Sequence, residues 1–124
     1  MKKYTLIAFP FFSAVLFSTN LPAVSFSDLG QVKTGWCSHA GSKTSWADVN
    51  GDGKADMLCD DAKGSHWILL SRGNGKFTDL GQVKTGWCSH AGSKTSWADV
   101  NGDRKADMLC DDVKGSHWIM LSRY

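Results

Sequence analysis

The chain has 124 residues, enough for one small domain, and a formal net charge of +2. All twelve acidic residues are Asp, and 14 Lys and Arg side chains balance them without forming a basic face. This balance argues against nucleic acid as the main partner. Gly, Asn and Asp are frequent and runs of good helix formers are rare, which favours turns and strands over helices.

Residues 1–25 have the pattern of a secretory signal peptide. A basic "MKK" precedes the apolar run "YTLIAFPFFSAVLF", and Ala23 and Ser25 are small residues suited to cleavage before Phe26. A transmembrane anchor is the alternative, but the run is short and no stop-transfer pattern follows it. Removal of this segment leaves 12 basic and 12 acidic side chains. We therefore expect a secreted, nearly neutral mature protein without a membrane span.

The rest of the chain consists of two copies of one unit, offset by 51 residues. Asp28–Gly73 aligns with Asp79–Tyr124, and the two copies differ at only four positions: Gly53/Arg104, Ala62/Val113, Leu69/Met120 and Gly73/Tyr124. We assign residues 26–78 to the first unit, which begins with a leading outer strand, and residues 79–124 to the second. Repeats of this length are single supersecondary units that need neighbours to bury their faces.

Turn-forming residues divide the first unit into four predicted strands, taken here in chain order. Gly-, Asn- and Asp-rich turns separate them, and Asn74-Gly75 is a strong hairpin signal. The predicted strands are Thr44–Val49, Asp56–Asp60, Ser65–Ser71 and Phe77–Val83. The third is apolar on both faces, which suits sheets stacked on each other. The predicted fold is therefore all-β, with two four-stranded antiparallel propeller blades.

The order of the predicted strands within the repeat indicates how the chain assembles. The chain after residue 25 opens with "FSDLGQV", a fourth-strand segment with no blade before it, and closes with "SHWIMLSRY", a third strand with no fourth. The opening segment is therefore suited to complete a blade formed by the end of another chain. We expect a homo-oligomer of three or four chains that closes a propeller, or a truncated part of a longer propeller. A monomer of two blades would leave the outer face of each blade exposed to water.

Four cysteines in an exported chain favour disulfides. Each unit holds one pair with a separation of 22 residues, which predicts the bridges Cys37–Cys59 and Cys88–Cys110. Each bridge would stabilise the fold by roughly 3 kcal/mol in the chain-entropy model. Pairing between units would require the two units to face each other. A zinc site that includes "CSH" and Cys59 is a further alternative.

The acidic loop "DVNGDGKADMLC" has the spacing of a calcium site. Side chains of alternate residues can point inward, a carbonyl can follow, and a last carboxylate can close a shell of oxygen ligands. The predicted ligands are Asp48, Asn50, Asp52, the Lys54 carbonyl and Asp56, and in the second copy Asp99, Asn101, Asp103, the Lys105 carbonyl and Asp107. An EF-hand does not fit, because its twelfth position would be Cys59 and its flanks are strands. A plain Asx-rich turn is the remaining alternative.

The second loop has Arg104 where the first has Gly53. If this position needs a positive φ, a residue other than Gly costs on the order of 1 kcal/mol, and the cationic side chain adds repulsion. We expect the second site to bind calcium more weakly than the first.

The segments "WADVNGDGKADMLC" and "WADVNGDRKADMLC" resemble the FG-GAP (VCBS) repeat found in integrin alpha propellers and in related fungal and bacterial propeller lectins. The resemblance covers residues 26–124. It implies a β-propeller with calcium bound between the first two strands of each blade, by the residues named above. The chain departs from the family in having only two units, in its cysteine pairs and in Arg104.

Nothing in the sequence indicates an enzyme. His39, His66 and the Asp60-Asp61 pair are the candidate catalytic groups, and turn formation and packing account for them better. Trp46 and Trp67 are expected in the core because both lie in the middle of strands.

The Gly-rich segment "KTGWCSHAGSK" suits a ligand site. Its Trp36 and His39, with their copies Trp87 and His90, provide aromatic faces and polar groups of the kind that bind sugar rings. We therefore expect a lectin-like module that binds a glycan. The alternatives are an integrin-like module for an extracellular protein ligand and an accessory fragment of a secreted hydrolase.

Overall fold

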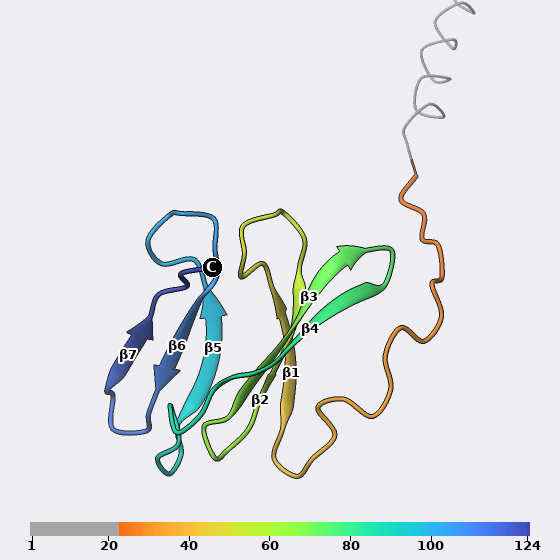
Figure 1. Ribbon diagram of the computed structural model, residues 1–124. Helices are drawn as coiled ribbons and strands as arrows, with labels where there is room; N and C mark the ends of the chain where they lie inside the picture. Colours follow the sequence, from red (N-terminus) through yellow and green to blue (C-terminus); the bar gives the residue numbers. More distant parts are fainter. Residues whose placement is uncertain (1–22) are drawn as a thin grey trace, which may run out of the picture.

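The computed structural model describes residues 23–124, so the predicted signal peptide lies almost wholly outside the described residues. Seven strands form two antiparallel sheets that lie side by side (Figure 1). The first sheet has the order β1-β2-β3-β4 and the second β5-β6-β7. The strands are β1 (Lys43–Ala47), β2 (Asp56–Asp60), β3 (His66–Gly73), β4 (Lys76–Lys84), β5 (Lys94–Ala98), β6 (Asp107–Asp111) and β7 (His117–Met120). The all-β prediction is confirmed.

Strand boundaries differ little from those predicted. β2 begins and ends as expected, and β3 and β4 extend one or two residues further. β1 ends at Ala47 instead of Val49, because the Asp48 carboxylate accepts loop N–H groups and Val49 N–H donates to Asp56. Local side-chain acceptors thus end the ladder before the apolar run ends.

The prediction of four strands per unit is correct for the first unit only. The second sheet has three strands, and β7 pairs with β6 alone within residues 23–124. Residues 23–34, which include the predicted leading strand, form no strand. They cannot pair with β3, because β4 already occupies that edge of the first sheet. In the described part of the chain, no helix has the length and apolar character needed to cross a membrane.

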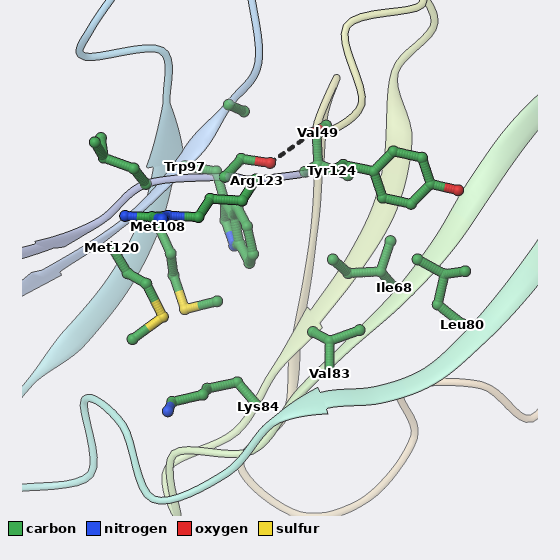
Figure 2. A pocket seen from close by; sticks show the side chains of 13 residues that line it. Val49, Ile68, Leu80, Val83, Lys84, Trp97, Met108, Met120, Arg123 and Tyr124 are labelled. Atoms are coloured by element: carbon green, nitrogen blue, oxygen red, sulfur yellow. Dashed lines mark hydrogen bonds between the residues drawn. The ribbon is translucent and has the colours of Figure 1, made fainter.

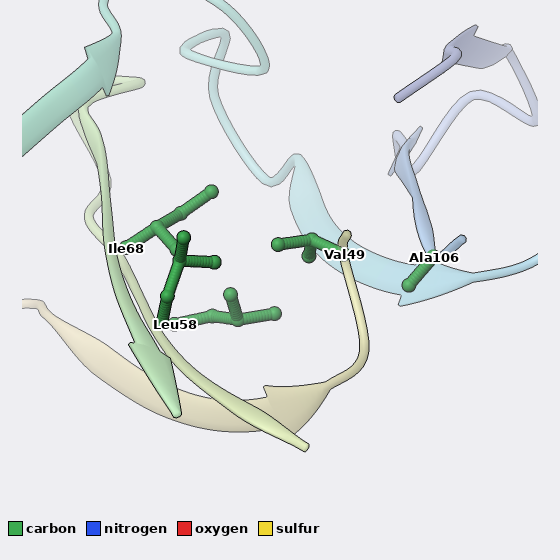
Figure 3. Close-up of a cluster of buried hydrophobic side chains, with 5 residues drawn as sticks. Val49, Leu58, Ile68 and Ala106 are labelled. Carbon is green, nitrogen blue, oxygen red and sulfur yellow. The ribbon is translucent and has the colours of Figure 1, made fainter. Parts of the chain in front are cut away.

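The two sheets share one hydrophobic core. It consists of Val49, Leu58, Ile68, Leu70 and Ala106 (Figure 3), and Ala47 and Trp97 pack against it. Most of these side chains come from the first unit, whereas Ala106 and Trp97 come from the second. One face of the first sheet is therefore buried by the second sheet.

Besides the β3–β4 ladder, five hydrogen bonds link the first sheet and its loops to residues that follow β4; we call this contact the inter-unit joint. At one end, Trp87 N donates to Gly64 O (3.2 Å), a ring nitrogen of His66 bonds Trp87 O (3.0 Å), and Trp97 Nε1 donates to Asp60 Oδ2 (2.9 Å). His66 is fully buried, and its other ring nitrogen lies 2.6 Å from Asp60 Oδ1. Both ring nitrogens therefore have a polar partner, one within the first unit and one in the second.

The other end of the joint lies beside the acidic loops. Ala106 N donates to Asp48 O (2.6 Å), and Ser122 Oγ donates to Val49 O (2.7 Å). An apolar groove of ≈ 250 Å³ remains between the sheets, where Leu80 and Val83 on β4 face the second sheet (Figure 2).

The expectation that Trp46 lies in the core is wrong. Its side chain is 54% exposed, whereas its copy Trp97 packs into the joint. The two residues have the same register, Trp46 opposite Met57 and Trp97 opposite Met108. Only Trp97 has a preceding unit to pack against.

Candidate functional site

The first acidic loop folds around the carboxylate of Asp48. Asp48 Oδ1 accepts hydrogen bonds from Gly51 N (2.7 Å) and Asp52 N (3.3 Å), and Oδ2 accepts one from Gly53 N (2.7 Å). Gly51 and Gly53 have positive φ angles, which turn these N–H groups inward. One side chain thus holds the turn from Gly51 to Gly53.

Asn50 and Asp52 continue the same pattern. Asn50 Oδ1 accepts from Asp52 N at 3.2 Å, and Asp52 Oδ1 accepts from Lys54 N at 2.9 Å. The bond from Lys54 N, together with the Lys54 and Asn50 side chains, holds the pKa of Asp52 below its ordinary value. The loop therefore keeps Asp52 ionised and close to Asn50.

Asp56 anchors the loop to the sheet. Its carboxylate is fully buried and accepts from Val49 N (2.9 Å) and Ser71 N (2.8 Å), which ties the loop to the end of β3. Burial raises the pKa of Asp56, and the negative charges of Asp52 and Asp48 raise it further. A cation in this loop would offset that repulsion.

The second loop repeats this geometry. Asp99 accepts from Gly102 N (2.7 Å) and Arg104 N (2.8 Å), and Asp107 accepts from Val100 N (3.0 Å) and Ser122 N (2.8 Å). Burial tends to raise the pKa of Asp99, but the backbone N–H groups of the loop, that of Arg104 first, lower it overall.

Arg104 has a φ of +70°, close to the +81° of Gly53. The second loop therefore keeps the left-handed conformation in spite of its bulkier residue.

The chemistry of the loops fits a hard cation. Their side chains offer carboxylate and amide oxygens, each of which has two lone pairs and can accept from a backbone N–H and still face an ion. In residues 23–124, no three His, Cys, Asp or Glu side chains converge as a metal-ligand group, and this includes the three Asp predicted as ligands in each acidic loop. The zinc alternative is wrong, because both cysteines of each unit form disulfides. The predicted bridges Cys37–Cys59 and Cys88–Cys110 are confirmed.

A recess lies beside the first disulfide, and its cavity measures ≈ 290 Å³. Its lining residues are Gly35, Trp36, Cys37, Ser38, His39, Cys59 and Trp67. The His39 ring stands edge-on to Trp67 with 4.9 Å between the ring centroids. The structure thus brings the predicted ligand residues Trp36 and His39 together, and it adds Trp67, which we expected in the core.

Asp61 holds His39 in place. His39 Nε2 lies 3.3 Å from Asp61 Oδ2, while Asp61 Oδ1 accepts from Lys63 N and Ser65 N at 2.9 Å each. Burial tends to raise the pKa of Asp61, but these N–H groups and His39 lower it below its ordinary value. Asp61 is thus a turn residue, as predicted, and it also orients a side chain of the recess.

The second unit forms the same recess, with a cavity of ≈ 190 Å³. It is lined by Gly86, Trp87, Cys88, Ser89, His90, Cys110 and Trp118. His90 stands edge-on to Trp118 at 4.9 Å, and His90 Nε2 lies 3.5 Å from Asp112 Oδ2. The two recesses therefore have matching walls.

Sequence reasoning missed Trp67 and Trp118 as walls of the recesses. The signal was the register of the second hairpin of each unit, which pairs Trp67 with Cys59 and Trp118 with Cys110. Cross-strand partners share a face of the sheet, so each Trp lies beside the disulfide of its unit.

A third cavity of ≈ 500 Å³ lies between the units, and Trp46, Lys43, Lys94 and Asp60 are among its lining residues. Ser45 Oγ is buried there without a hydrogen-bond partner. His66 and Asp60, considered above as catalytic candidates, are engaged in the inter-unit joint.

Comparison with protein families identifies the repeat. The FG-GAP-like repeat profile matches residues 48–110, a span that contains both acidic loops and the strands between them. Comparison with curated proteins and with solved structures gives no match. The chain therefore belongs to the family of FG-GAP-like repeat proteins.

Proposed function

We propose that the protein is a secreted recognition module that binds glycans through its two recesses and is stabilised by calcium in its acidic loops. The family supports an interaction module of the β-propeller type. Two disulfides, and the lack of a membrane-spanning helix in residues 23–124, are consistent with an extracellular location.

The observation that carries the glycan proposal is the repetition of one recess in both units. Each recess combines two indole rings, a histidine oriented by a carboxylate and a serine beside a rigid disulfide. Indole faces stack on the apolar faces of sugar rings, and a few polar groups then select hydroxyl positions. Two sites on one chain also raise the overall affinity for a ligand with repeated sugars.

A glycan array tests this proposal. We expect the wild-type protein to bind a defined set of glycans and a free monosaccharide to compete. The variant Trp36→Ala/Trp87→Ala should lose about tenfold or more in affinity, whereas Tyr124→Ala removes an exposed aromatic side chain outside the recesses and should bind as the wild type does. If no glycan binds while an extracellular protein ligand does, the protein-interaction alternative is correct.

The support for calcium is the electrostatics of the first loop. Asp56 is buried close to the charges of Asp48 and Asp52, and burial and both charges raise its pKa. A divalent cation would lower the pKa of Asp56 again, because it favours ionised carboxylates and replaces their repulsion with attraction. The loop supplies oxygen ligands alone, which calcium prefers.

Thermal unfolding in calcium and in chelator tests the site. Calcium at a hundredfold excess over the Kd of the first loop should stabilise the wild type by about 2.7 kcal/mol through that loop. Asp52→Ala should abolish this part of the response and leave only the part due to the second loop. Asp79→Ala is the matched control, because Asp79 Oδ1 also accepts an N–H two residues along, from Gly81 (2.8 Å). Equal responses to calcium in both variants would exclude this loop as the site.

A further inference from the structure

The second unit exposes the copy of the surface that, in the first unit, contacts the second unit; we call it the receiving surface. In the first unit this receiving surface includes Gly64 and His66, both buried under the second unit. Their copies lie open: Gly115 is exposed, with nothing within 4 Å of the point that a Cβ would occupy, and the His117 side chain is 67% exposed. By contrast, a Cβ on Gly64 would lie 2.5 Å from Trp87 O.

The His–Asp pair of the receiving surface is also already formed in the second unit. His117 Nδ1 lies 2.6 Å from Asp111 Oδ1, the same distance as between His66 and Asp60. The remaining ring nitrogen and the second carboxylate oxygen, which bond the neighbouring unit in the first copy, face solvent in the second. The polar half of a joint is thus preorganised.

The receiving surface also contains apolar side chains. Val49, Ile68 and Leu70 are between 3% and 8% exposed because the second unit covers them. Their copies Val100, Ile119 and Leu121 are between 44% and 59% exposed. Adjacent exposed side chains of this kind mark an interaction site.

The matching surface lies at the other end of the chain. The second unit contributes four residues to the inter-unit joint: Trp87, Trp97, Ala106 and Ser122. Their copies in the first unit are Trp36, Trp46, Ala55 and Ser71. Trp46 and Ala55 are exposed, so the chain carries a free copy of each half of its own joint.

The strand edges agree with this arrangement. β4 contains "FTDLGQV" (residues 77–83) and pairs with β3, whereas the outer edge of β7 has no partner in the described residues. Residues 26–32 read "FSDLGQV" and form no strand, and Phe26 is 93% exposed. Figure 1 shows this segment leaving the first sheet on the side away from β7. In this structure the segment therefore lies away from β7 of its own chain.

We propose that a second copy of the chain docks head to tail on the second unit. Its residues 26–32 pair with β7 as a fourth strand, its Trp36 backbone meets Gly115 and His117, and its Trp46 indole donates to Asp111. Every contact repeats one that the chain makes within itself, and the proposal depends on neither calcium nor a glycan. Such a heterologous contact closes into a ring or grows as a filament.

Light scattering of the purified chain over a range of concentrations tests this contact. The wild type should show masses that are multiples of the single chain. Gly115→Ala, which places a methyl group where the second copy must lie, should weaken association by about tenfold or more, and so should Trp46→Phe, which removes the indole N–H together with the five-membered part of the ring. Gly81→Ala is the control, because Gly81 also has a positive φ (68°) and open space around it.

Hydrogen exchange locates the contact. In the oligomer, amides of residues 26–32 and β7 should gain protection, and they should lose it in Trp46→Phe. A wild-type chain that stays monomeric at every concentration would overturn the proposal, and a different partner, such as a further repeat, would then cover the surface. Association that persists unchanged in both Gly115→Ala and Trp46→Phe would overturn it as well.

Discussion

At the residue scale, single side chains organise the loops and turns. Asp48 and Asp99 gather the N–H groups of the acidic loops, and Asp61 and Asp112 do the same for the turns that follow β2 and β6. In these loops and turns the short Asp side chain reaches backbone groups two to five residues away.

Arg104 stores strain in the second acidic loop. Its φ of +70° lies in the left-handed region, where a non-Gly residue costs about 1 kcal/mol. We expect Arg104→Gly to raise the free energy of unfolding by about that amount, measured by urea denaturation in chelator. Gly53→Arg should lower it similarly. No change in either variant would contradict the strain argument.

The turn carboxylates make the fold sensitive to acid. The pKa of Asp61 is lowered from its ordinary value of 3.8 although burial opposes the shift, because Ser65 N, Lys63 N and His39 favour the ionised form. Its contribution is therefore present above that value and is lost as the pH falls through the lowered pKa. Stability should decline over this acidic range.

Asp61→Asn isolates this effect. Asn keeps an oxygen for the two N–H groups but cannot titrate. The urea midpoint of Asp61→Asn should fall less steeply than that of the wild type as the pH drops below 3.8. Asp112→Asn should behave alike, since Ser116 N and Lys114 N lower the pKa of Asp112. Parallel curves for all three proteins would contradict the argument.

At the element scale, β2 is the centre of the first unit. Every one of its residues is buried, because β1 and β3 pair with its two edges and both faces are covered. The disulfide from Cys59 fastens the irregular segment that carries Trp36 and His39 onto this strand. The recess therefore depends on a covalent link to the most buried strand.

Removing that link should destabilise the chain. Cys37→Ala/Cys59→Ala opens a loop with a sequence separation of 22, which should cost about 3 kcal/mol of unfolding free energy in urea denaturation. Cys88→Ala/Cys110→Ala has the same separation and should cost about as much. A large difference between the two double variants would show that packing, and not loop closure, dominates.

At the scale of the whole molecule, the inter-unit joint decides what is buried. Trp97→Phe leaves Asp60 Oδ2 without its indole donor in a nearly closed site, so it should lower the unfolding free energy by about 1–3 kcal/mol. Trp46→Phe is the control, because its indole is exposed and its loss should change the stability of the monomer by less than about 0.5 kcal/mol. Both are measured by urea denaturation at dilutions where light scattering shows a monomer. If Trp97→Phe and Trp46→Phe lowered the unfolding free energy by the same amount, the argument that only Trp97 stabilises the joint would be wrong.

Local patterns in the sequence predicted most elements of the first unit. Turn residues located its four strands within one or two residues, and the equal separation of the cysteines predicted both disulfides. They also predicted that His39 and Trp36 belong to one site, which the structure brings together. These features arise from interactions within one unit, and one unit contains all the residues involved.

The environments of the copied residues depend on tertiary structure alone. His66 and His117, or Trp97 and Trp46, have the same neighbours in sequence, yet one of each pair is buried or packed and the other is exposed. No local pattern distinguishes two nearly identical segments. Burial here comes from a neighbouring unit, a non-local contact that the first unit has on one face and the second has on the other. The sequence by itself thus determined the strands, the bridges and the acidic loops, and the packing of one unit on the next decided which copy of each residue is exposed.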